Sequence, residues 1–141
     1  MKRYSVLGVM PSRRAAGVLI VLLLGAVSFD LSVVFLRQRQ ASGVAVDVAN
    51  DLASAAFDEA AFRATGEFVL DPRRADDLAR SYVDGSDLGG RIIDLDVEVV
   101  GDDRVRVTIT AQVDYVFARA IPGASDGTTV TASATAFAAA G

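Results

Sequence analysis

Apolar and polar positions follow three successive patterns along the chain, and the first is an almost unbroken apolar run. From Ala15 to Leu36 nearly every side chain is apolar, and Asp30 is the only ionisable residue. A helix that crosses the hydrocarbon core of a bilayer needs about 20 apolar residues. This run of 22 residues is therefore long enough, and we predict a transmembrane helix over residues 15–36.

Basic residues flank the apolar run unequally, and this asymmetry predicts the topology. Four basic residues precede the run, whereas two follow it closely. Because cationic flanks are retained on the cytoplasmic side, we predict that residues 1–14 form a cytoplasmic basic tail and that the rest is extracytoplasmic. The protein would then be a single-pass component of the cytoplasmic (inner) membrane. The four preceding residues are Lys2, Arg3, Arg13 and Arg14.

A cleaved secretory signal is the alternative interpretation of this segment. The small residues Ala41, Ser42 and Gly43 offer a peptidase site. However, the apolar run exceeds the usual 7–15 residues of a signal core, and the helical pattern continues through the cleavage point. The mass of the mature protein separates the two interpretations.

The second pattern has helical periodicity and continues from the apolar run. It predicts one helix from about Ser12 to Arg63, within an extracytoplasmic stalk and connector over residues 37–70. A bend is expected at Gly43, because glycine weakens a helix interior. We expect the Ala-rich stripe of this helix to cover a sheet and to allow the close approach of a neighbouring subunit. The stripe consists of Val48, Ala49, Leu52, Ala53, Ala56, Phe57 and Ala60.

The third pattern, within residues 71–141, begins with a short helix and ends in strands. Asp71 and Pro72 suit the start of a helix over 72–83, on which Leu78, Ala79 and Tyr82 share a face. From Ile92 onward the period becomes two. Ile93, Leu95, Val97 and Val99 form one apolar face, and the alternation resumes at Val105 after a turn.

The faces of these strands select one register. A three-residue loop pairs Val99 with Val105 and keeps apolar and polar faces apart, and it places Glu98 opposite Arg106 on the solvent side. A third strand over 128–137 has small inward side chains, across which the stalk helix can lie. The predicted fold is α+β, with a long N-terminal transmembrane and stalk helix packed on a three-stranded antiparallel sheet.

The amino-acid composition limits which catalytic, metal and cofactor sites the chain can form. The chain has no His and no Cys, so the common zinc, haem and nucleophile-base sites are absent. Its net charge of −4 argues against a nucleic-acid partner. Asp94, Asp96 and Glu98 alternate along a strand, which favours a solvated face over a metal site or an acid-base pair. We therefore expect a protein without enzymatic activity, metal or cofactor.

Several segments together resemble the TadE/TadG-like proteins of the tight-adherence (Flp) pilus assembly system. They are Arg13-Arg14 before the span, Asp30 late in it with Arg37-Gln38-Arg39-Gln40-Ala41 after it, the run 49–56 (ANDLASAA), and the closing 129–136 (TVTASATA). The resemblance implies a minor pilin or pseudopilin that binds the bilayer and other assembly proteins. Prepilin peptidase substrates carry a glutamate five residues after a glycine, but Gly8 and Gly17 are followed by Arg13 and Leu22. The resemblance is thus nearer the unprocessed, TadG-like members.

Two places are candidate binding sites. Asp30 is costly in hydrocarbon, so we predict either that it pairs with a basic group on an adjacent subunit, giving homo- or hetero-oligomers through the N-terminal helix, or that it reaches water. The segment 117–127 contains Ile121 and Pro122, which form either an apolar tip for a partner or the bilayer surface, or a segment in which Ile121 tucks under the sheet. The alternative to a pilus role is a membrane-anchored extracytoplasmic binding module that uses this loop.

Overall fold

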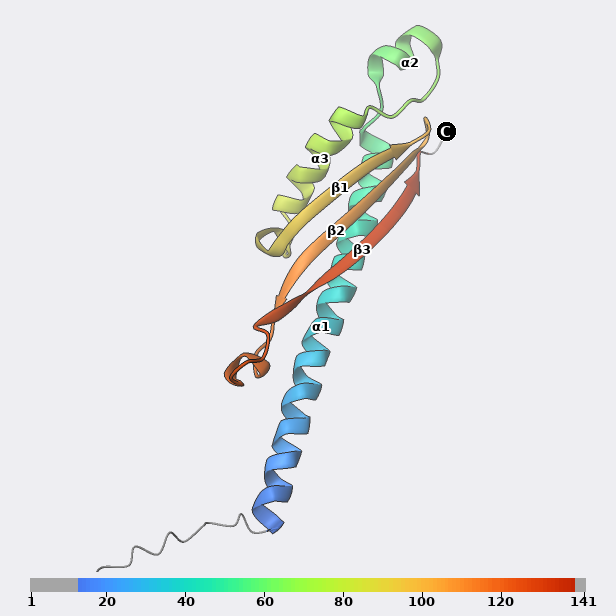
Figure 1. Cartoon of the computed structure of the whole chain (residues 1–141). Helices are drawn as coiled ribbons and strands as arrows, with labels where there is room; N and C mark the ends of the chain where they lie inside the picture. The colour runs from blue at the N-terminus through green and yellow to red at the C-terminus, as the bar shows by residue number, and fades with distance from the viewer. Residues whose placement is uncertain (1–12, 139–141) are drawn as a thin grey trace, which may run out of the picture.

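Helix α1 runs without interruption from Arg13 to Ala55 in the computed structural model, which describes residues 13–138 (Figure 1). Its N-terminal part extends beyond the sheet, and only 6% of its most apolar 18-residue window is buried. Within residues 13–138, it is the one helix that is long and apolar enough to cross a membrane. The core helix of a soluble protein would be mostly buried, so the exposure of this window favours a lipid environment.

Three antiparallel strands form one sheet in the order β1-β2-β3. The chain alternates apolar and polar residues in each strand, and the apolar side faces the helices. Short 3-10 turns at Gly89–Arg91 (η1) and Ala118–Ala120 (η2) lie outside the strands. The strands are β1 Ile92–Val100, β2 Arg104–Asp114 and β3 Gly127–Phe137.

The register of β1 and β2 confirms the predicted three-residue loop. Val99 is paired with Val105, and Glu98 lies opposite Arg106 with 3.2 Å between its Oε2 and the arginine Nη1. Gly101 has a φ of +72°, which glycine adopts without the clash that a Cβ causes. Sequence alternation was thus sufficient to select this hairpin.

The start of β1 differs from the prediction. The register shifts between Ile92 and Asp94, and Ile93 is 58% exposed rather than part of the apolar face. Ile92 packs against the core instead. An extra residue in one strand reverses the side-chain alternation, so the expected inward position of Ile93 is wrong.

The core lies between the sheet and the helices that cover one of its faces. Helix α1 crosses β2 and β3, whereas α3 (Pro72–Asp84) lies against β1 and α1. Small side chains on β3 allow α1 to approach closely, as predicted, because Ala132 and Ala136 are almost fully buried. The buried residues of α1 are Asp30, Ala41, Ala45, Val48, Ala49, Leu52 and Ala53.

Helix α1 ends eight residues earlier than the predicted Arg63. Asp58 stops the continuation because its carboxylate accepts hydrogen bonds from the amides of Ala60 and Ala61 and begins a separate helix, α2 (Glu59–Thr65). Phe57 is extended and forms a bridge with Leu70. At the other end, the predicted start at Ser12 lies outside the described residues. Helical structure continues through Gly43, where a bend was expected.

Helix α3 confirms the predicted short helix with one added residue. Asp71 accepts a hydrogen bond from the amide of Arg73, and Pro72 is the first helical residue. The buried face carries Ala75, Ala79 and Val83, whereas Tyr82 is 40% exposed and does not share it. Leu78 is half-buried and packs against the core beside Ala79, so two of the three residues predicted to share this face do so.

Candidate functional site

The carboxylate of Asp30 contacts the chain's own β2–β3 loop, residues 115–126. Helix α1 places Asp30 toward this loop, and the residue is only 5% exposed. One oxygen, Oδ1, accepts hydrogen bonds from the amides of Val116 (2.8 Å) and Phe117 (3.2 Å). The other, Oδ2, accepts from Phe117 (3.3 Å) and Ala118 (2.8 Å). Three consecutive amides thus enclose one carboxylate, which stabilises its negative charge.

A ring contact joins the loop to the helix next to these hydrogen bonds. The rings of Phe29 and Phe117 meet edge to face, with 5.3 Å between centroids and an interplanar angle of 85°. Edge-to-face rings attract each other beyond their apolar burial. Figure 1 shows the loop at the lower end of the sheet, beside the middle of α1. The loop is thereby held at the height of Asp30 on the helix.

This geometry gives Asp30 a partner that neither sequence interpretation contained. The two predicted partners were water and a basic group on an adjacent subunit, whereas both oxygens are engaged within the chain. The hydroxyls of Ser28 and Ser32 are also satisfied locally, by the carbonyls of Leu24 and Ser28. Pairing between subunits through Asp30 stays a prediction, but it is not needed to explain the carboxylate.

Ile121 and Pro122 lie at the surface of the β2–β3 loop. Ile121 is 46% exposed, so it does not tuck under the sheet. Val116 and Phe117 have similar exposure. The loop therefore presents an apolar surface, as the first of the two sequence interpretations described.

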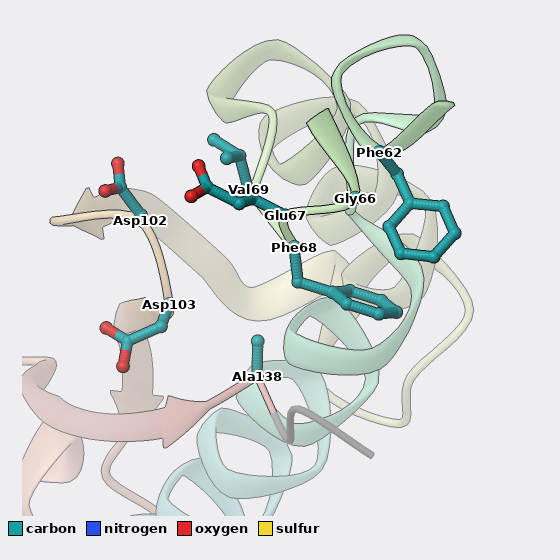
Figure 2. A pocket seen from close by; sticks show the side chains of 8 residues that line it. All are labelled: Phe62, Gly66, Glu67, Phe68, Val69, Asp102, Asp103 and Ala138. Atoms are coloured by element: carbon teal, nitrogen blue, oxygen red, sulfur yellow. The ribbon is translucent and has the colours of Figure 1, made fainter. Parts of the chain in front are cut away.

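A groove of about 650 Å³ opens at the opposite end of the molecule from the start of α1, between α2, the segment that follows it and the β1–β2 turn. Figure 2 shows Phe62 and Phe68 on one side and the carboxylates of Asp102 and Asp103 on the other. The two rings contact each other at a tilt of 51°, with 4.8 Å between centroids. A groove with an aromatic wall and an acidic wall fits a ligand with apolar and cationic parts.

The acidic row on β1 lies on the solvent face of the sheet. Asp94, Asp96 and Glu98 are all exposed, and Glu98 is paired with Arg106. Within residues 13–138, no group of three or more acidic side chains is arranged to hold a metal ion. Arg13 and Arg14 are exposed at the beginning of α1, and the rest of the predicted basic tail lies outside the described residues.

Sequence reasoning missed the amides that bind Asp30. Val116–Ala118 is separated from Asp30 by more than 80 residues, and a backbone donor carries no residue-type signal. Phe117 was noted only as the first residue of the loop. The single clue was the cost of a carboxylate in an apolar run, which demands a partner without identifying it.

Comparison with known proteins identifies no relative of this chain. No family model, no curated protein and no solved structure matches the chain.

Proposed function

We propose that the protein is a non-enzymatic, membrane-anchored component of a Flp-type pilus or a related secretion apparatus, similar to a minor pilin or pseudopilin. Helix α1 anchors it in the cytoplasmic membrane, with the N-terminus in the cytoplasm. The sheet domain lies outside and meets other assembly proteins. The resemblance of the sequence to TadE/TadG-like proteins supplies the pilus assignment.

One observation carries the proposal: a single helix serves as both the anchor and the core of the folded domain. The first half of α1 is apolar and exposed, and one face of the second half, from Ala41 to Ala53, is buried against the sheet. A rigid connection of this kind transmits position and force from the membrane to the domain, which suits an assembly component. A flexible tether would suit an independent binding module better.

The same continuity argues against a cleaved signal. Ala41, the first residue of the small-residue site, and Ala45, two residues after it, are both fully buried. Cleavage there would also remove Asp30 and leave the loop amides without their acceptor. Retention of the complete helix is therefore the state that keeps these contacts.

The proposal is tested in the organism that encodes the chain. Deletion of the gene should abolish surface filaments seen by electron microscopy, and the wild-type gene should restore them. Val21→Asp places a carboxylate among lipid chains, which costs about 2.5–3.5 kcal/mol at the bilayer centre, and should lower membrane retention and filament number together. Val46→Asp is the matched control, because Val46 is exposed on the folded half of the same helix.

Filaments at wild-type numbers in the deletion strain would exclude the pilus role. The distal groove favours a second candidate, a membrane-anchored binding module unrelated to pili. That candidate predicts that filaments persist in the deletion strain, and that Phe68→Ala at the groove weakens binding of a partner with apolar and cationic parts while membrane retention is unchanged.

A further inference from the structure

The apolar part of α1 that precedes Asp30 is too short to cross a membrane by itself. Residues Ala15 to Phe29 number 15, and at 1.5 Å per residue they span about 22 Å. The hydrocarbon core is about 30 Å thick. The helix reaches that thickness only if the apolar residues from Leu31 to Leu36 also lie in lipid, and Leu31, Phe35 and Leu36 are all more than half exposed. Asp30 then lies about 9 Å inside the outer boundary.

The β2–β3 loop lies at the same depth because hydrogen bonds fasten it to Asp30. Irregular backbone is costly in lipid, since its polar groups lose water. Here most amides from Tyr115 to Ile121 are satisfied within the chain. Asp30 accepts from three of them, and carbonyls accept from the others. The satisfied amides are those of Tyr115, Val116, Phe117, Ala118, Ala120 and Ile121.

The outward side chains on the part of the loop that is fastened to Asp30 are mostly apolar, whereas Ser125 and Asp126 at its other end are exposed and polar. Val116, Phe117 and Ile121 are 44–46% exposed. Phe117 also borders an almost wholly apolar groove of about 500 Å³ against α1, which an acyl chain fits. The exposed Arg119 has a long side chain that reaches toward lipid phosphates while its aliphatic part stays in apolar surroundings.

We propose that the β2–β3 loop inserts into the outer leaflet of the membrane that α1 crosses, with Val116, Phe117 and Ile121 among the upper acyl chains. The inference rests on the membrane anchor of the proposed function. It adds a second membrane contact, so that the sheet domain is held at a defined height and rotation above the bilayer. At that depth the hydrogen bonds between the Asp30 carboxylate and the loop amides offset the cost of removing both groups from water.

The absence of cysteine allows a clean test with single-cysteine variants of the full chain. Ile121→Cys, Leu22→Cys and Thr135→Cys are each labelled with an environment-sensitive fluorophore in vesicles of phosphatidylcholine and phosphatidylglycerol. Leu22 reports on the anchor, and the exposed Thr135 on β3 reports on water. A spin label near the top of the acyl chain should quench the Ile121 label about threefold more than the Thr135 label.

The outcomes separate the loop from the anchor. If the Leu22 label is in lipid and the Ile121 label is quenched only by aqueous iodide, loop insertion is wrong while the anchor stands. If the Leu22 label is also in water, both proposals fail. If shielding of the Ile121 label grows with the protein-to-lipid ratio, a second copy of the chain covers the loop, and the lipid assignment is overturned.

Discussion

Replacing Leu52 by alanine tests whether the outer half of α1 is the core of the sheet domain. Leu52 is fully buried and is among the largest buried side chains. Alanine removes three carbons, worth about 2.4 kcal/mol of apolar transfer at 0.8 kcal/mol each. The cavity left behind raises the expected loss to about 3–5 kcal/mol. A domain with an ordinary stability of 5–15 kcal/mol would lose a large part of it.

Urea unfolding of the full chain in detergent micelles, followed by circular dichroism in the strand region, measures this loss. With a slope of about 1.5 kcal/mol per molar urea, a loss of 3 kcal/mol lowers the midpoint by about 2 M. Leu36→Ala is the control, because it is the same substitution on the same helix at a residue that is 57% exposed. Equal midpoints for the two variants would refute the packing of α1 as the domain core.

Three further predictions concern the sheet and the N-terminal cap of α3. Gly127→Ala should destabilise the β2–β3 pair by the same urea assay, because a Cβ would collide with the backbone of the opposite strand; Gly90→Ala, with open space, should match the wild type. Asp71→Ala should cost about 1 kcal/mol and lower helicity, since it removes the cap of α3. A double-mutant cycle on Glu98 and Arg106 should give about 0.2–1 kcal/mol that disappears in 1 M salt, and a salt-independent coupling would contradict the solvent-exposed pair.

The local pattern of the chain was enough to predict most elements. Alternation placed the three strands and selected the hairpin register, because a slip of one residue would bring Glu98 to the apolar face. Asp71 and Pro72 located α3 through capping, which is a local effect. Small residues on α1 and β3 also indicated that these elements pack together.

At two places in the fold, hydrogen bonding competes with the apolar periodicity, and the sequence pattern does not reveal which one prevails. Helical periodicity runs through Phe57, but Asp58 caps a new helix and the bridge to Leu70 takes up the extended backbone. Alternation likewise includes Ile93, yet a bulge turns that side chain outward. At Phe57 the local cap by Asp58 acts together with the bridge to Leu70, and at Ile93 the pairing with β2 sets the side chain; in both places hydrogen bonding outweighed the apolar period.

The sequence by itself determined that Asp30 is an anomaly, because a carboxylate in an apolar run is costly wherever the chain folds. Only the tertiary structure decided which groups bind the Asp30 carboxylate. The partners are backbone amides more than 80 residues away, and every residue type except proline carries the same amide. Their selection depends on where the β2–β3 loop comes to lie beside α1, which packing of the sheet against the helix sets.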